Sequence, residues 1–123
     1  MPYKITFTDE KIFLRVKAEG EQTFEDNIDL AEKTAAEAFP KKYQRVLVDI
    51  RGFTGQPGIG FDYEYAKFIS RLIENKITKI AVIYKPSSEE FTKFFETASK
   101  NRGMNLNAFT DEKQAEEWIN GTE

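Results

Sequence analysis

The sequence predicts an α/β fold in which a mostly parallel five-stranded sheet carries four helices, with an antiparallel hairpin at its N-terminal end. Two observations support this prediction. Short stretches of alternating or β-branched apolar residues, typical of strands, lie between longer stretches in which apolar residues recur at helical spacing. These elements follow the order ββαβαβαβα, and strands that alternate with helices indicate a parallel sheet. Because the connections are short, we expect a single domain over residues 1–123.

The first two strands are predicted over residues 3–8 and 11–18, where apolar and polar residues alternate. The apolar face of the second strand is formed by Ile12, Leu14, Val16 and Ala18. Only Asp9 and Glu10 lie between the two strands, which is short enough for a hairpin turn. Three further strands are predicted over residues 45–50, 79–84 and 105–109. The first two of these are β-branched apolar runs, typical of strands that are buried on both faces.

The remaining elements are helices, predicted over residues 24–39, 61–75, 88–102 and 111–120. Thr23 and Asp26 have the spacing of a capping box at the start of the first helix. Ser87 and Glu90 have the same spacing before the third helix, and Thr110 is the predicted cap of the fourth. The predicted buried face of the first helix consists of Phe24, Ile28, Ala31, Ala35 and Ala38 or Phe39.

The composition excludes several classes of site. The chain has no cysteine and no histidine, so it has no disulfide, thiolate nucleophile, imidazole base or metal site built from these residues. Its formal net charge of −3 argues against nucleic-acid binding, which usually needs a basic surface. No apolar run reaches the roughly 18 residues of a membrane span, and the N-terminus has no apolar signal region. We therefore expect a cytoplasmic protein without a cofactor or a metal.

The segment over residues 51–60 is the most unusual, because it holds four glycines and one proline. It leaves the carboxyl end of a predicted central strand, where ligands bind in α/β sheets. It also leads into a predicted helix, and the amides at a helix N-terminus can hold an anion. Its spacing matches neither of the common phosphate-binding glycine motifs. The alternative interpretation is that the glycines form a tight crossover turn.

Charged residues near this segment also have two interpretations. Asp62 and Glu64 can bind a divalent cation or act in acid–base chemistry, or they can simply suit the positive end of a helix dipole. Asp49, at the end of the predicted strand, is interpreted as an acceptor of backbone hydrogen bonds or as a cap of the loop. A small basic group is interpreted as a solvated turn rather than an anion site, and consists of Lys41, Lys42, Arg45 and Arg51.

Aromatic residues gather around the same segment. Helical spacing places Phe61 and Tyr65 on the face of the second helix that packs against the core. Tyr63 lies to one side of that face. We therefore expect Tyr63, together with Phe53 on the loop, to be exposed. Exposed aromatic residues beside glycines can form a contact patch for a protein or a hydrophobic ligand.

The element order and three segments resemble the STAS/SpoIIAA-like family, the fold of the anti-sigma-factor antagonists. Residues 48–53 resemble the family's third strand and the start of its switch loop. Residues 58–60 resemble the Gly-x-Gly that opens the following helix, and residues 109–119 resemble the last strand and helix of the SpoIIAA-like subgroup. The resemblance covers nearly the whole chain and implies a binding function rather than catalysis.

One departure from the family pattern affects the expected mechanism. In regulatory members, an Asp-Ser pair precedes the Gly-x-Gly and a partner kinase phosphorylates the serine. Here Gln56 and Pro57 precede Gly58, and no serine occurs between Asp49 and Ser70. The resemblance therefore implies a member of the uncharacterised SpoIIAA-like subgroup without this switch, whose fold has also been compared with lipid-binding Sec14-type domains.

The first functional hypothesis is a non-catalytic, STAS-like binding or regulatory module with a protein partner. It acts through residues 52–60 and the N-terminal half of the second helix, and the residues expected to carry binding are Phe53, Thr54, Gly55, Gly58 and Tyr63. A homodimer through an exposed strand edge remains open.

The second hypothesis is a carrier of a small apolar or lipid-like ligand. Its basis is the count of eleven phenylalanines, which can line a cavity rather than fill a core. It predicts an apolar pocket between the sheet and the second or third helix. A third hypothesis, a carboxylate-based enzyme, would use Asp49, Asp62 or Glu64.

Overall fold

The computed structural model describes residues 3–55 and 63–121. The strands within these ranges are β1 (Lys4–Asp9), β2 (Leu14–Glu21), β3 (Arg45–Thr54), β4 (Lys79–Ile83) and β5 (Leu106–Phe109). The helices are α1 (Phe24–Ala38), α2 (Tyr63–Ile73), the 3₁₀ helix η1 (Pro86–Ser88), α3 (Glu89–Asn101) and α4 (Glu112–Asn120). The predicted fold class and element order are confirmed.

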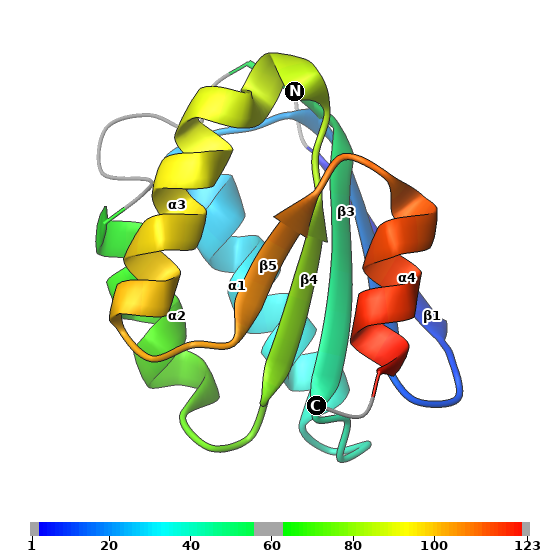
Figure 1. Ribbon diagram of the computed structural model, residues 1–123. Coiled ribbons are helices and arrows are strands. Elements are labelled where there is room, and N and C mark those ends of the chain that lie inside the picture. The colour runs from blue at the N-terminus through cyan, green and yellow to red at the C-terminus, as the bar shows by residue number, and fades with distance from the viewer. Residues whose placement is uncertain (1–2, 56–62, 122–123) are drawn as a thin grey trace.

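The strands form one sheet in the order β1-β2-β3-β4-β5. β1 pairs with β2 in the antiparallel sense, and every later pair is parallel. Parallel neighbours need crossover connections, which are right-handed in nearly all proteins. Because β2 to β5 follow one another across the sheet in a single direction, α1, α2 and α3 all fall on the same face (Figure 1). α4 follows the last strand and covers the opposite face, over β3 and β4 (Figure 1).

A separate hydrophobic core lies on each face of the sheet. On the face covered by α1 to α3, Leu14, Val16 and Ala18 of β2 pack with residues of all three helices. The core under α4 is smaller and consists of Phe13, Leu47, Ala81, Ile83, Ala115 and Ile119. Alternate residues of the central strands therefore supply both cores, as expected for strands that are covered on both faces.

The hairpin turn between β1 and β2 is longer than predicted. β2 begins at Leu14, and the amide of Glu10 donates to the carbonyl of Phe13 at 3.1 Å. The turn therefore takes up the first residues of the strand expected from residue 11. Ile12, placed on the core face by the alternation, is 49% exposed, and Phe13 is only 4% exposed. Phe13 is buried because it packs into the core beneath α4, which the alternation in this one strand does not reveal.

Of the predicted helix caps, one is confirmed and two are displaced. Thr23 and Asp26 form the complete capping box at the start of α1. The N-cap of α4 is Asp111 rather than Thr110, and its side chain accepts from the amide of Gln114 at 3.1 Å. Residues 86–88 form η1, so α3 begins at Glu89 and Ser87 is not its cap. Proline with its fixed φ favours the first position of a helical turn, which explains the earlier start.

Candidate functional site

The first part of the candidate site is the end of β3, which continues through Thr54 rather than stopping at residue 50. Lys17 of β2 pairs with Asp49, but Glu19 pairs with Gly52, so β3 has one extra residue in this interval. This is a β-bulge, and it exchanges the faces to which the following side chains point. The glycine-containing segment predicted over residues 51–60 is therefore partly strand.

The bulge buries Phe53, and the prediction that this side chain is exposed was wrong. Phe53 pairs with Gly20, on the same face of β2 as Ala18, and so points into the core beneath the helices. It is 2% exposed, and its ring centroid lies 6.0 Å from that of Tyr3. Without the extra residue, simple alternation would place Phe53 on the face of Asp49. The side chain of Phe53 is therefore part of the core and is not available for contact with a partner.

Thr54 and Gly55 are exposed, and the end of β2 holds them in place. The backbone amide of Gln22 donates to the carbonyl of Thr54 at 3.1 Å, and its side-chain amide donates to the carbonyl of Gly55 at 3.2 Å. Gln22 is buried and accepts from the side chain of Asn27 on α1 at 3.0 Å. Gly55 has a φ of +75°, a conformation that glycine adopts without strain. Hydrogen bonds from Gln22, which is itself bound to α1, therefore hold the backbone of Thr54 and Gly55 at the end of β3.

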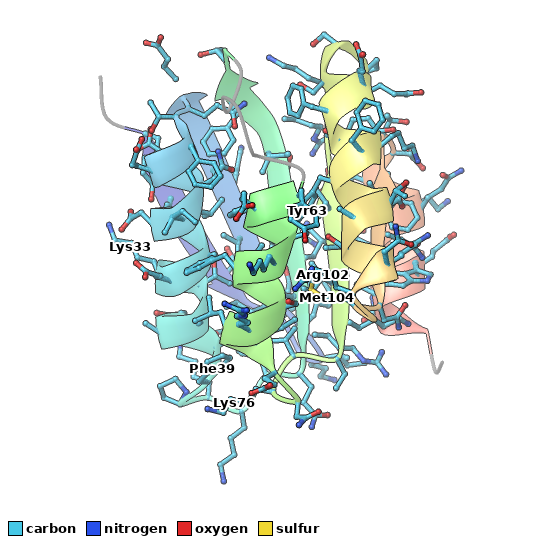
Figure 2. All side chains as sticks on the ribbon, turned by 90° about the vertical axis from the view of Figure 1, so that its left-hand side faces the viewer. Lys33, Phe39, Tyr63, Lys76, Arg102 and Met104 are labelled. Carbon is cyan, nitrogen blue, oxygen red and sulfur yellow. The ribbon has the colours of Figure 1, made fainter. Side chains whose placement is uncertain are left out.

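Tyr63 is the first residue of α2 and is 55% exposed, as predicted. Its ring lies on the side of α2 that faces α3, where the guanidinium carbon of Arg102 is 5.8 Å from the ring centroid (Figure 2). Tyr65 is buried, as predicted. The predicted site residue Gly58 lies outside the described residues, as do Phe61 and Asp62. Thr54 and Gly55 therefore adjoin the end of β2, while Tyr63 adjoins α3.

On the face of the sheet beneath α4, Asp49 and Arg51 form a fixed pair. Asp49 accepts from the amide and from Nε of Arg51, both at 3.0 Å, and from its terminal nitrogen at 2.7 Å. Burial raises the pKa of Asp49, but these hydrogen bonds outweigh burial and hold the pKa below its ordinary value. The interpretation of Asp49 as an acceptor of a backbone hydrogen bond is confirmed. Arg51 also donates to Glu112 of α4 at 3.0 Å.

The structure does not gather the predicted basic group into one site. Arg51 is bound to Asp49, whereas Arg45 lies near the other end of β3 and donates to the carbonyls of Ile119 and Gly121. Lys41 is paired with Asp9 and Glu37. Within residues 3–55 and 63–121, no group of three or more acidic side chains is placed to hold a metal ion.

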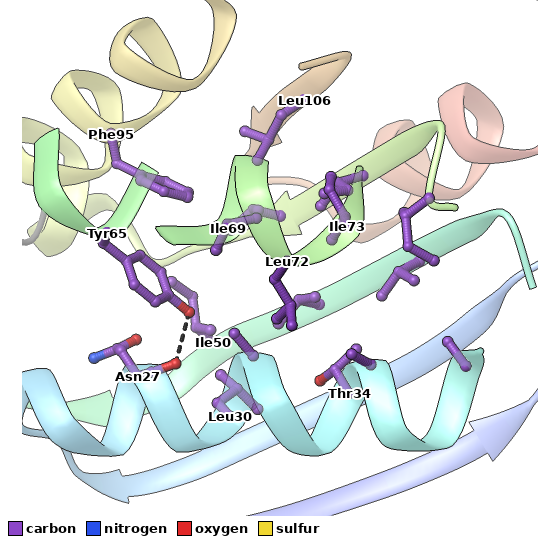
Figure 3. A pocket seen from close by; sticks show the side chains of 18 of the residues that line it. Asn27, Leu30, Thr34, Ile50, Tyr65, Ile69, Leu72, Ile73, Phe95 and Leu106 are labelled. Carbon is purple, nitrogen blue, oxygen red and sulfur yellow. Dashed lines mark hydrogen bonds between the residues drawn. The ribbon is translucent and has the colours of Figure 1, made fainter. Parts of the chain in front are cut away.

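The second part of the candidate site is a cavity of about 90 Å³ between the sheet and the helices α1 and α2, with α3 at one side (Figure 3). The described residues that line it carry no charged side chain and include Leu30, Val46, Ile69, Leu72, Val82 and Leu106. At one end, the hydroxyl of Tyr65 donates to the backbone carbonyl of Asn27 at 2.8 Å and joins α2 to α1 (Figure 3). Burial raises the pKa of Tyr65, which keeps this donor neutral. An apolar pocket at this place is what the carrier hypothesis predicts.

Several residues of this cavity lie outside the predicted buried faces of the helices. The predicted buried face of α1 leaves out Asn27, Leu30 and Thr34, all of which line the cavity. These three residues follow helical spacing together with Ala31 and Ala38, so the signal was present. Two of the three, Asn27 and Thr34, are polar, so a pattern of apolar residues alone does not include them.

The comparison with known families decides the identity of the fold. The SpoIIAA-like family model matches residues 13–120. The chain belongs to the SpoIIAA-like family. The predicted family is therefore confirmed. SpoIIAA-like domains are typically non-catalytic regulatory modules, and SpoIIAA-like proteins bind proteins.

Two solved structures show the same SpoIIAA-like fold. An uncharacterised protein of the DUF3478 family with a SpoIIAA-like fold, from Shewanella loihica PV-4, has a TM-score of 0.61 at 17% identity, over 95% of this chain and 93% of that one. An anti-sigma factor antagonist from Mycobacterium paratuberculosis has a TM-score of 0.66 at 11% identity, over 98% of this chain and 96% of that one. No curated protein matches this chain. Among the helices that the structure describes, none has the length and apolarity that crossing a membrane requires.

Proposed function

We propose that this SpoIIAA-like domain is a non-catalytic binding or regulatory module that acts through the end of β3 and the N-terminal half of α2. The observation that carries the proposal is the exposure of Tyr63, a large aromatic residue at the start of a helix that follows the carboxyl end of a central strand. Thr54 and Gly55, at the end of β3, are exposed as well. Such a surface suits a protein partner, because exposed aromatic residues anchor protein interfaces.

The proposed mechanism does not use a serine switch. The chain has no serine between Asp49 and Ser70, and Thr54 is the only threonine within residues 51–60. Binding would then depend on the shape and chemistry of the surface rather than on phosphorylation of a loop serine. The similar fold of an anti-sigma factor antagonist supports a protein as the partner class.

The test is affinity capture from the native cell, with the wild type and Tyr63→Ala compared side by side. Phe94→Ala is the matched control, because Phe94 on α3 is exposed to nearly the same extent as Tyr63, at 58%. We expect Tyr63→Ala to lose the captured partner and Phe94→Ala to keep it. The melting temperatures of both variants should be close to that of the wild type. Equal capture by all three proteins would contradict this site. Phe53→Ala is not informative here, because it would leave a hole in the core.

A second candidate function, the carrying of a small apolar ligand, is supported by the cavity between the sheet, α1 and α2. Native mass spectrometry of protein purified without detergent tests it. Ala31→Leu places a larger side chain in the cavity lining, whereas Ala36→Leu adds the same atoms at an exposed position of α1. We expect a small-molecule adduct on the wild type and on Ala36→Leu, but not on Ala31→Leu. An adduct that persists on Ala31→Leu would place the ligand elsewhere.

A further inference from the structure

The two edges of the sheet, formed by β1 and β5, are protected differently (Figure 1). At the β5 edge, the amide of Ala108 donates to the carboxylate of Glu96 on α3 at 2.8 Å. The side chain of Glu96 is only 12% exposed and is paired with Lys93 and Lys100. A charged side chain held against a sheet edge opposes the addition of another strand. The β5 edge is therefore blocked by Glu96.

The register of β1 against β2 shows which of its backbone groups point away from the sheet. Glu10 and Phe13 continue this register, and the amide of Glu10 donates to the carbonyl of Phe13 at 3.1 Å. Hydrogen-bonded and non-hydrogen-bonded pairs alternate along an antiparallel ladder. Every second residue back from Glu10 therefore bonds to β2, and the amides and carbonyls of Ile5 and Phe7 point to the open edge. Within residues 3–55 and 63–121, these outward groups have no hydrogen-bond partner.

The charged residues of β1 lie at its two ends, Lys4 and Asp9, and its four central residues are uncharged. Edge strands that avoid pairing are commonly protected by a central charge, a proline or a bulge. β1 contains no proline, and its register with β2 runs without a shift from Lys4 to Asp9. β1 therefore lacks the protection that Glu96 gives to β5.

The side chains of β1 suit a second copy of the same strand. Ile5 and Phe7 pack against the core beneath the helices but are only half-buried at the sheet edge. Thr6, on the opposite face, is exposed. When two copies of β1 lie antiparallel with Thr6 opposite Thr6, each Ile5 lies opposite Phe7 of the second copy. An added strand in this position would cover the apolar side chains at the edge.

This register is compatible with both the backbone and the side chains. It places the outward groups of Ile5 opposite those of Phe7, so that each pair can exchange both of its N–H···O hydrogen bonds. It also pairs a β-branched side chain with an aromatic one, which is a favourable cross-strand pair. Lys4 lies opposite Thr8, so no like charges meet. A parallel pair in register would instead bring the two Lys4 side chains together.

We infer that this protein forms a symmetric homodimer through β1, in which the two sheets join by an antiparallel β1–β1 pair centred on Thr6. The dimer goes beyond both proposed functions, because it uses neither Tyr63 nor the cavity. The paired segment is short, so the interface is smaller than that of a standard stable complex. The dimer is therefore weak and depends on protein concentration.

The first experiment is sedimentation velocity of the full chain from about 10 µM to about 1 mM, a range that covers weak association. We expect a monomer–dimer equilibrium in the wild type. Amide hydrogen exchange measured by NMR over the same range tests the edge directly. The amides of Ile5 and Phe7 should exchange more slowly as the concentration rises. Those of Thr6 and Thr8, which already bond to β2 in the monomer, should change little.

Thr6→Glu and Thr6→Lys test the register. Each variant places like charges opposite one another at the centre of the pair and should raise the Kd of the dimer about fivefold, the effect of a repulsive cross-strand pair. An equimolar mixture of the two variants should dimerise at least as strongly as the wild type, because opposite charges then meet. Thr97→Glu is the matched control, because Thr97 is exposed on α3, and its Kd should equal that of the wild type.

Thermal melting should show that all three variants are folded, since both threonines are exposed. A chain that stays monomeric over the whole concentration range would leave the β1 edge to a strand of another protein and overturn the inference. A dimer that forms equally well in Thr6→Glu, Thr6→Lys and their mixture would use another surface, and this result would overturn it as well.

Discussion

The bulge in β3 shows how a single residue sets the geometry of the candidate site. The extra residue between Asp49 and Gly52 directs Phe53 into the core and leaves the Asp49 and Arg51 side chains together on the other face. It also brings Gly52 directly opposite Glu19 of β2. A Cβ atom added at Gly52 would lie 2.6 Å from the Cβ atom of Glu19 and 3.2 Å from the carbonyl oxygen of Ala18. The bulge therefore requires a residue without a side chain at this position.

Gly52→Ala is expected to destabilise the protein by about 2 kcal/mol, because the added methyl group forces β2 and β3 apart. Chemical denaturation measured by circular dichroism checks this value. The double variant Gly52→Ala/Glu19→Gly removes the closest atom of the clash. It should therefore lose less stability than the sum of the two single variants. Strictly additive losses would show that the contact between these two residues is not the cause.

At the scale of the element, α4 is held to the sheet by cations at both of its ends. Near its N-terminus, Glu112 and Glu116 both bind Arg15 of β2. At its C-terminus, Lys79 donates to the carbonyl of Trp118 at 2.6 Å and lies 4.6 Å from the centroid of its indole ring. Arg45 binds the carbonyls of Ile119 and Gly121. The last carbonyls of a helix have no partner within the helix and carry partial negative charge. Lys79 and Arg45 therefore supply hydrogen-bond donors to these carbonyls and positive charge at the negative end of the helix dipole.

Lys79→Met is expected to destabilise the protein by about 1–3 kcal/mol, because it removes the donor to the partly buried carbonyl of Trp118 while keeping the aliphatic stem. Lys79 is 2% exposed, so water cannot easily replace the ammonium group. Hydrogen exchange should show faster opening at the C-terminal end of α4 than in the wild type. Lys76→Met is the control, because Lys76 is exposed and lies over the ring of Phe39 at the surface. An equal loss of stability in both variants would contradict a specific role of Lys79.

Across the whole molecule, the sequence predicted what depends on periodicity and missed what depends on partners distant in the chain. The strands, helices and parallel topology follow from local alternation and helical spacing, and the capping box at Thr23 follows from a local contact. The exposure of Phe53 was mispredicted, because the bulge is a property of the pairing between β2 and β3. The burial of Phe13 was missed for a similar reason, since α4, which covers it, comes about a hundred residues later.

In the candidate site, too, features that follow from local spacing could be predicted, and features that depend on distant parts of the chain could not. The exposure of Tyr63 could be predicted, because the helical spacing that places Tyr65 in the core leaves Tyr63 at the side. The cavity was predicted only as a consequence of the carrier hypothesis, between the sheet and the second or third helix, and the part that α1 takes in its lining was not predicted. A cavity is the space that packing leaves unfilled, so it depends on the positions of three helices relative to the sheet.

The acid sensitivity of the whole molecule should depend in part on Asp49. Its pKa is held below the ordinary value in the folded state, where burial is outweighed by the hydrogen bonds from Arg51. The folded state then binds fewer protons at this carboxyl than the unfolded state does, so stability rises with pH over the range in which Asp49 titrates. The contribution of Asp49 is complete above its unfolded pKa and is lost as the pH falls through its folded pKa. The stability of the wild type should therefore decrease as the pH falls below about 5 and the carboxyl of Asp49 takes up a proton.

Asp49→Asn should lose about 1–3 kcal/mol at neutral pH, because the hydrogen bonds of Arg51 no longer go to a charged acceptor. Its free energy of unfolding should also vary less with pH than that of the wild type, so that the two curves converge in acid. Denaturant titrations over a pH series measure both effects. Asp9→Asn is the control: the pKa of Asp9 is also lowered, first by the hydrogen bond from Lys41, but its side chain is exposed and solvent screens the pair. Curves for wild type and Asp49→Asn that stay parallel down to low pH would mean that the Asp49–Arg51 pair fixes the bulge without contributing to acid sensitivity.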